Sequence, residues 1–203
     1  MWNLLYAVWY TPSKQLLWRL LLKFKRNVLV VFSNIIKFKN YEIGKSIYEE
    51  NCKNIISEIF DLCKKNNCKI FFPSDVRVGK NTKDKSTIKS ISEISVDDMI
   101  LDIGPKTVSL IKDIINNSNT ILWNGPAGYF ENPEFSKGSE EIAKKIIERK
   151  KQNKIYCVSG GGDTVAVLNS FGLTNDFDFV STAGGAFLEF LEGKELPGIK
   201  ALN

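Results

Sequence analysis

Residues 155–164 read Ile-Tyr-Cys-Val-Ser-Gly-Gly-Gly-Asp-Thr, an apolar run that leads directly into three consecutive glycines. The run at 155–158 is short, apolar and partly β-branched, which is typical of a buried strand. The glycines form a turn signal, and we expect a helix over residues 163–170. The stretch therefore predicts a strand, a glycine turn and a helix, which is the repeating unit of α/β proteins.

The same alternation extends from this stretch in both directions. Further strands are expected at residues 28–32, 69–72, 99–102, 120–123 and 177–180, and further helices at 46–65, 106–117, 134–151 and 184–191. Residues 79–89 are polar and rich in lysine, which favours a surface loop or an edge hairpin. Apolar strands that alternate with helices imply a parallel sheet covered on both faces. We therefore predict one α/β domain with a doubly wound, mostly parallel, Rossmann-like sheet.

Three of the expected strands end in loops that contain glycine, at residues 123–126, 159–164 and 181–185. In open α/β sheets, ligands bind outside the carboxyl ends of the strands. Three glycines in succession allow backbone N–H groups to approach an anion closely, because no Cβ is in the way. The positive end of the following helix dipole adds to this attraction, so phosphate oxygens are the expected ligands.

Asp163 has two interpretations that the residues alone leave open. At the start of a helix it would be a good N-cap. Beside bound phosphates it would instead hold a divalent cation, with the nucleotide supplying further oxygen ligands. The loop at 183–185 repeats the strand–glycine–helix arrangement, so two helix N-termini could hold a phosphoryl group without a side-chain base. Neither loop matches a P-loop or a GxGxxG fingerprint, and residues 44–46 (Gly-Lys-Ser) lack the leading glycine of a P-loop.

Charge and composition narrow the class of partner. The formal net charge is +5, but residues 1–40 contain seven basic and no acidic side chains, which leaves −2 on residues 41–203. The main body therefore has no basic excess for nucleic acid, and we expect no nucleic-acid partner. The chain has no histidine, which excludes an imidazole base, and its four cysteines lack a zinc-ligand spacing. Scattered thiols of this kind favour a reducing compartment, so we expect the protein in the cytoplasm. We also expect it to be a monomer.

The N-terminal segment differs from the rest of the chain. No apolar run in it reaches the roughly 18 residues that a membrane span needs. A basic amphipathic helix lying on a membrane surface is one interpretation of this segment. We favour the other, a sequence that does not belong to the fold, and expect no membrane partner. We divide the chain into an atypical basic and apolar segment at residues 1–34 and a domain at residues 35–203.

Residues 122–131 (Leu-Trp-Asn-Gly-Pro-Ala-Gly-Tyr-Phe-Glu) resemble the WNGPxGxFE segment of phosphoglycerate kinases. Five further stretches resemble motifs of the same family in the same order: IGKS at 43–46, LDIGPKT at 101–107, GGGDT at 160–164, STxGGA at 181–186 and the closing LEFLEGKELPG at 188–198. The chain is identified on these six motifs as similar to the nucleotide-binding, C-terminal half of that family.

The resemblance implies an activity and a set of site residues. The family transfers a phosphoryl group reversibly between 1,3-bisphosphoglycerate and ADP, giving 3-phosphoglycerate and ATP in glycolysis, with Mg²⁺ as cofactor. It implies that Glu131 contacts the ribose, and that Asp163 is the metal ligand. The other implied nucleotide-binding positions are Asn124, Gly125, Pro126, Gly161, Gly162 and Thr164, and the implied backbone donors to the transferring group are Gly184 and Gly185.

The departures from the family pattern bear on activity. No residue matches the lysine that contacts the nucleotide phosphates in the family, and residues 29–34 replace its GGxMxxTF stretch. Ile100 and Ala183 each stand where the family usually has glycine. The resemblance leaves the glycerate-binding lobe without a counterpart, and our hypothesis is a truncated or frame-disrupted gene product whose first thirty or so residues do not belong to the fold. We therefore expect a phosphotransferase lobe that acts on 3-phosphoglycerate only if the other lobe is supplied, or alternatively a Mg-nucleotide-binding remnant without catalysis.

Overall fold

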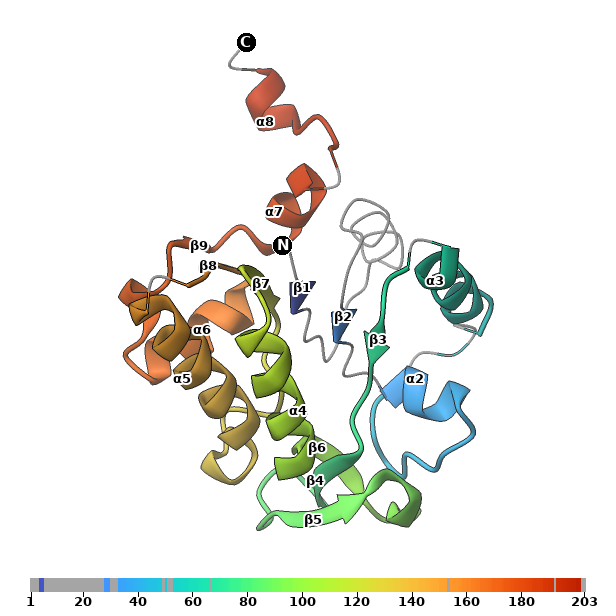
Figure 1. The fold of residues 1–203 in the computed structure, drawn as a ribbon. Helices are drawn as coiled ribbons and strands as arrows, with labels where there is room; N and C mark the ends of the chain where they lie inside the picture. Colours follow the sequence, from blue (N-terminus) through green and yellow to red (C-terminus); the bar gives the residue numbers. More distant parts are fainter. Residues whose placement is uncertain are drawn as a thin grey trace.

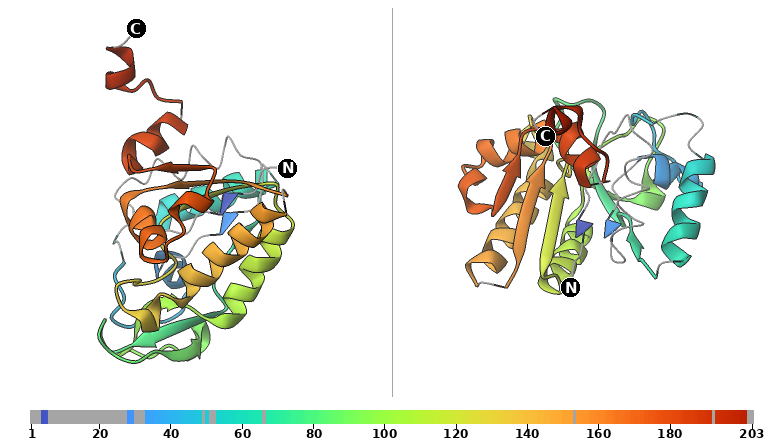
Figure 2. Two further views of the ribbon diagram at one scale, coloured as in Figure 1. Left: turned by 90° about the vertical axis from the view of Figure 1, so that its left-hand side faces the viewer. Right: turned by 90° about the horizontal axis from the view of Figure 1, so that it is seen from above.

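A computed structural model describes residues 4–5, 28–29, 33–48, 50, 53–65, 67–152, 154–191 and 193–201. Its larger sheet has six strands in the order β3-β2-β1-β7-β8-β9, and every pairing in it is parallel. The strands are β1 (Leu4–Leu5), β2 (Val28–Leu29), β3 (Ile70–Phe71), β7 (Thr120–Asn124), β8 (Tyr156–Gly160) and β9 (Phe179–Ser181). Figure 2 shows these strands side by side, which confirms the predicted parallel α/β sheet.

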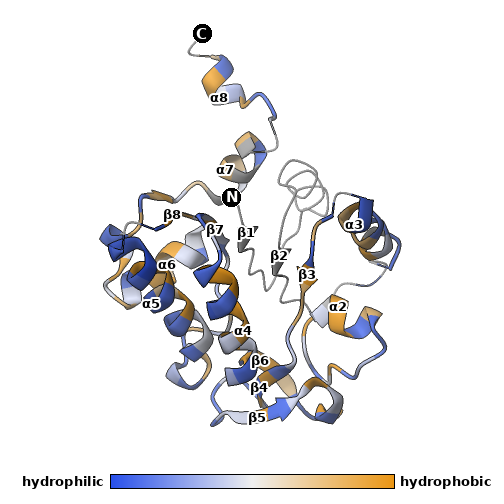
Figure 3. Ribbon diagram, viewed as in Figure 1, coloured by the Kyte–Doolittle hydropathy of each residue, from blue (hydrophilic) through white to orange (hydrophobic). Residues whose placement is uncertain are grey.

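Helices lie on both sides of this sheet. They are α2 (Ser33–Phe38), α3 (Lys53–Lys65), α4 (Pro105–Asn116), α5 (Lys137–Lys151), α6 (Gly162–Ser170), α7 (Gly184–Leu191) and α8 (Pro197–Lys200), with 3-10 turns η1 (Ile91–Glu93), η2 (Pro133–Phe135) and η3 (Thr174–Asp176). Figure 1 shows α4, α5 and α6 on one side of β7 to β9 and α7 on the other. The main core lies around Trp123, between the sheet and the helices α4, α5 and α6. The outer face of α5 is coloured hydrophilic in Figure 3.

A second, antiparallel sheet corrects one part of the prediction. The strand expected at 99–102 is β6 (Met99–Ile103), but it pairs with β4 (Asp75–Gly79) and not with the parallel sheet. The sheet order is β5-β4-β6, with β5 (Thr87–Ser90) at its edge. β4 alternates polar and apolar residues and buries Val76 and Val78 against the same cluster as Ile100. The edge-hairpin interpretation of residues 79–89 is confirmed, because β4 and β5 are antiparallel neighbours.

The parallel sheet includes one strand, β1, that the sequence does not predict. β1 lies between β2 and β7, and the strand expected at 28–32 is described for residues 28–29.

The helix expected from residue 46 is wrong in its first turn, because residues 46–48 are not helical. The reason is that the Ser46 hydroxyl accepts a hydrogen bond from Ile100 N at 2.8 Å, which ties this residue to β6. The domain boundary at residue 35 stays a prediction.

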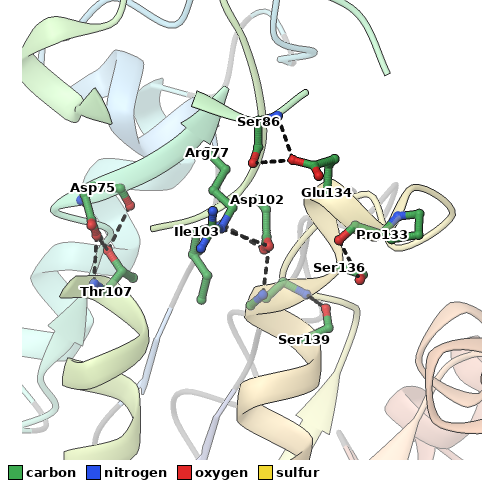
Figure 4. Close-up of polar contacts among 12 residues, drawn as sticks. Asp75, Arg77, Ser86, Asp102, Ile103, Thr107, Pro133, Glu134, Ser136 and Ser139 are labelled. Carbon is green, nitrogen blue, oxygen red and sulfur yellow. Dashed lines mark hydrogen bonds and ion pairs between the residues drawn. The ribbon is translucent and has the colours of Figure 1, made fainter. Parts of the chain in front are cut away.

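Two buried aspartates hold the N-termini of α4 and α5. Asp75 accepts hydrogen bonds from Lys106 N (2.9 Å), Thr107 N (2.8 Å) and Thr107 Oγ1 (2.7 Å) at the start of α4. Asp102 accepts from Gly138 N in the first turn of α5 and from Ile103 N, both at 2.8 Å. Figure 4 shows the two carboxylates facing the two helix ends. Each aspartate satisfies N–H groups that a helix start leaves without a partner.

We expect Asp102 to make stability decrease as the pH rises from about 4 to about 7. Burial raises the pKa of this carboxyl from its ordinary 3.8 to about 7, and the two backbone donors only partly oppose that shift. Between these values the folded chain binds a proton that the unfolded chain has released, so the free energy of unfolding should fall by about 1.4 kcal/mol per pH unit. Urea unfolding of the native chain and of Asp102→Asn measures this. A difference between the two that does not change across the interval would contradict it.

Candidate nucleotide-binding site

The three glycine loops meet at one edge of the parallel sheet. Asn124 is the register partner of Gly160, and Gly160 is the partner of Ser181, so the last residues of β7, β8 and β9 form one row. Gly161 N donates to Ser181 O at 3.2 Å and joins two of the loops directly. The predicted convergence of these loops at the carboxyl ends of the strands is therefore what the structure shows.

Thr164 ties the first two loops together. Its hydroxyl oxygen accepts a hydrogen bond from Gly125 N at 2.6 Å and donates to Gly160 O at 2.8 Å. The side chain is fully buried. The hydroxyl of Thr164 is thus engaged within the protein, where it positions the backbone around the site.

The first turn of α6 is open at its N-terminus. The N-cap residue is Gly161, at φ +97°, and no side chain caps the helix. The interpretation of Asp163 as the N-cap is therefore wrong, because the helix begins one residue earlier and Asp163 lies inside its first turn. The Asp163 side chain is exposed and has no hydrogen bond or ion pair to any described residue. This helix start differs from those of α4 and α5, which buried carboxylates already occupy.

Asn124 presents a buried oxygen to the same place. The residue is 7% exposed, and its Oδ1 has no hydrogen-bond partner among the described residues. A Cβ added to Gly161 would lie 3.1 Å from this oxygen, so Asn124 faces the glycine loop. An unpaired buried polar atom costs free energy that a ligand could recover. The amide of Asn124 is therefore placed to contact a ligand above the loop.

Two of the predicted glycines face free space. A Cβ added to Gly162 or to Gly185 would meet no atom within 4 Å. These positions lie in the first turns of α6 and α7, which both begin after strands of this edge. Phe187 of α7 packs against Gly160, where an added Cβ would come within 2.5 Å of its ring. Phe187, which the sequence does not mark, thus helps to fix α7 beside the loop of β8.

Glu131 and Ile100 lie outside the three glycine loops. Glu131 is exposed, and its hydrogen bond to the Tyr129 hydroxyl raises the pKa of that tyrosine. Pro126 is buried, and Gly125 before it has φ +90°. The Ile100 side chain is buried in the cluster of the small sheet.

Asp163 is the sole acidic side chain proposed for a metal at this edge. Among the residues that the structure describes, no group of three or more acidic or cysteine side chains could hold a metal ion. A single exposed carboxylate suits Mg²⁺ that takes its other ligands from phosphate and water. The residues present therefore fit a metal that arrives with a nucleotide.

In the described part of the chain, no helix has the length and apolar character to cross a bilayer.

The fold and its loops define a doubly wound α/β domain of the kind that binds ligands at the carboxyl ends of its strands. The sequence model of the phosphoglycerate kinase family matches residues 24–194. The chain belongs to the phosphoglycerate kinase family.

Individual relatives agree with this assignment. Phosphoglycerate kinase of Zymomonas mobilis is 48% identical over 164 residues, which are 80% of this chain and 41% of the relative. That of Francisella tularensis subsp. novicida is 40% identical over 185 residues, 88% of this chain and 46% of the relative. The solved structure of phosphoglycerate kinase from Coxiella burnetii is 35% identical with a TM-score of 0.84, covering 98% of this chain and 52% of that one. The structure from Pyrococcus horikoshii, 23% identical with a TM-score of 0.74, shares the fold. The chain thus spans about half the length of these proteins.

Proposed function

We propose that this chain binds Mg-ADP and Mg-ATP at the carboxyl ends of β7, β8 and β9, as the nucleotide-binding lobe of a phosphoglycerate kinase. The observation that carries the proposal is the open start of α6. There the exposed Asp163, the accessible Gly162 and the unpaired oxygen of Asn124 surround one uncapped helix N-terminus. Family membership supports the choice of nucleotide over other anions.

Each residue has a separate part in this site. The N–H groups in the first turns of α6 and α7, at Gly162 and Gly185, would donate to phosphate oxygens. Gly161 contributes its positive φ and not its N–H, because that group already donates to Ser181 O. Asp163 would hold Mg²⁺, which neutralises charge on the phosphates when bound. Gly184 and Gly185 would face the transferring group, and Glu131 the ribose.

Phosphoryl transfer needs a second reactant held in line with the nucleotide. We place 3-phosphoglycerate and 1,3-bisphosphoglycerate in the part of the family that this chain does not span. The reversible reaction of the family would then require that part, and this chain alone would bind nucleotide without turnover. We also place the chain in the cytoplasm as a monomer, with the charge of −2 on residues 41–203 arguing against nucleic acid.

Calorimetric titration of the full chain with Mg-ADP tests the site. We expect saturable binding that Asp163→Ala weakens about tenfold, or about 1.4 kcal/mol. Because Asp163 is proposed to act through the metal, the difference between native and variant chains should vanish when EDTA removes Mg²⁺. Asp113→Ala is the matched control, since Asp113 is an exposed aspartate on α4.

The result that would overturn the proposal is a folded chain that does not bind Mg-ADP at all. A separate coupled assay with 3-phosphoglycerate and ATP measures turnover. Turnover by this chain alone would contradict the assignment of the glycerate site to another part of the family, while leaving the nucleotide site in place.

A further inference from the structure

A hollow opens between the N-terminal halves of α4 and α5, which lie side by side in Figure 1. Its volume is about 470 Å³, within the range of small-molecule sites. Three basic side chains line it, Arg77, Lys112 and Lys137, together with Glu140 and Glu141. None of the residues assigned to the nucleotide crevice is among them.

Arg77 is the most constrained of these side chains. It is only 14% exposed, and its Nε lies 4.0 Å from Asp102 Oδ2, which is too far for a hydrogen bond. That Nε is buried and has no hydrogen-bond partner among the described residues. Figure 4 places Arg77 beside Asp102, whose two oxygens already accept from backbone N–H groups. Asp102 therefore offers Arg77 a long ion pair but no hydrogen bond.

The acidic side chains of the hollow are already paired. Glu141 forms an ion pair with Lys112, and Glu140 forms one with Lys144 at 2.7 Å. Among the described residues Lys137 has no ion pair, and Arg77 has only the long one of 4.0 Å to Asp102. Two such charges at one hollow match a dianion better than a single carboxylate.

We propose that this hollow binds a small phosphomonoester, with its phosphate on Arg77 and Lys137 and its uncharged part over Pro105 and Val108. A phosphomonoester carries a charge near −2 at neutral pH, and a guanidinium donates two parallel hydrogen bonds to phosphate oxygens. Pro105 and Val108 supply an apolar wall, and Ser109 adds a hydroxyl. The site shares no residue with the proposed nucleotide site, so the phosphomonoester and the nucleotide would be able to bind at the same time.

An NMR titration of the ¹⁵N-labelled full chain tests this with glucose 6-phosphate, inorganic phosphate and glucose as probes. We expect glucose 6-phosphate to shift the amides of Ser109, Lys112 and Glu141 saturably, more tightly than inorganic phosphate, and glucose to shift none. Lys137→Gln should raise the Kd about tenfold, and Arg77→Gln at least as much. Lys151→Gln, an exposed lysine at the far end of α5, should leave the Kd unchanged.

Lys137 is exposed, so its variant decides the matter if Arg77→Gln fails to fold. An unchanged Kd in Lys137→Gln would overturn the proposal. So would shifts confined to Gly161, Gly162 and Gly185, which would mean that phosphate enters the nucleotide crevice instead. Equal affinity for inorganic phosphate and glucose 6-phosphate would exclude the contact with Pro105 and Val108, and with it the proposed class of ligand.

Discussion

Alanine at Gly128 is expected to lower the free energy of unfolding by about 3 to 5 kcal/mol, because the added methyl group overlaps atoms that are fixed in place. A Cβ at this position would lie 2.2 Å from the carbonyl oxygen of Phe135 and 2.4 Å from Asp102 Oδ1. Neither neighbour can retreat easily. Phe135 is fully buried, and Asp102 is held by backbone N–H groups at the start of α5.

Gly162→Ala is the matched control for this change. Its added Cβ meets nothing within 4 Å, and the residue lies in the first turn of α6, where alanine is a better helix former. Its stability should stay within about 1 kcal/mol of the native value, while Mg-ADP affinity falls because the methyl group obstructs the approach to the helix start. Urea unfolding followed by tryptophan fluorescence compares the two. A Gly128→Ala chain as stable as Gly162→Ala would mean that the 128–135 loop yields freely.

The parallel half of the fold is predictable from local patterns. The strands β7 and β8 are mostly apolar runs that end in Asn124 and Gly160, and β7 is buried along most of its length. β9 is a shorter edge strand, and its Phe179 is half exposed. A strand buried on both faces looks the same whichever sheet it joins, which is why β6 was assigned to the wrong one. Its partner β4 alternates like a half-buried strand, and an alternating Asp-Val-Arg-Val at 75–78 was the available signal.

In the candidate site, too, features that depend on neighbouring residues are predictable from the sequence, and features that depend on distant residues are not. The glycine loops can be recognised from the sequence, and the parallel register of the strands brings them together. The exact cap of α6 was missed because Gly161 adopts φ +97°, which local residue preference does not reveal when three glycines are adjacent. The roles of Asp75, Asp102 and Phe187 depend on partners distant in the chain, such as Asp75 and Thr107, which are 32 residues apart. One local hint existed: α4 begins with Gly104 and Pro105, neither of which has a side chain that could cap it.

Replacing Asp75 with alanine is expected to cost about 3 kcal/mol of stability, because two buried backbone N–H groups lose their acceptor. The Thr107 hydroxyl loses one of its two acceptors and keeps the Asp75 carbonyl oxygen at 2.9 Å. Two backbone N–H groups at the start of α4 and the Thr107 hydroxyl would lose the buried carboxylate that accepts from them. α4 contributes Ile111 and Ile115 to the main core, so loosening its first turn weakens the packing under β7. Urea unfolding measures the loss, and Asp75→Asn, which keeps one acceptor, should lose about half as much.

Asp75→Ala also distinguishes the two kinds of helix N-terminus in this chain. At α4 and α5 the N-terminus is closed by a carboxylate from the protein itself, whereas at α6 it is open. Asp75→Ala should therefore change stability but leave the Mg-ADP affinity of the folded chain within about twofold of native, a difference of about 0.4 kcal/mol. Calorimetry below the unfolding temperature measures that affinity. A Mg-ADP affinity that falls together with stability would show that the α4 terminus, and not only that of α6, takes part in binding the nucleotide.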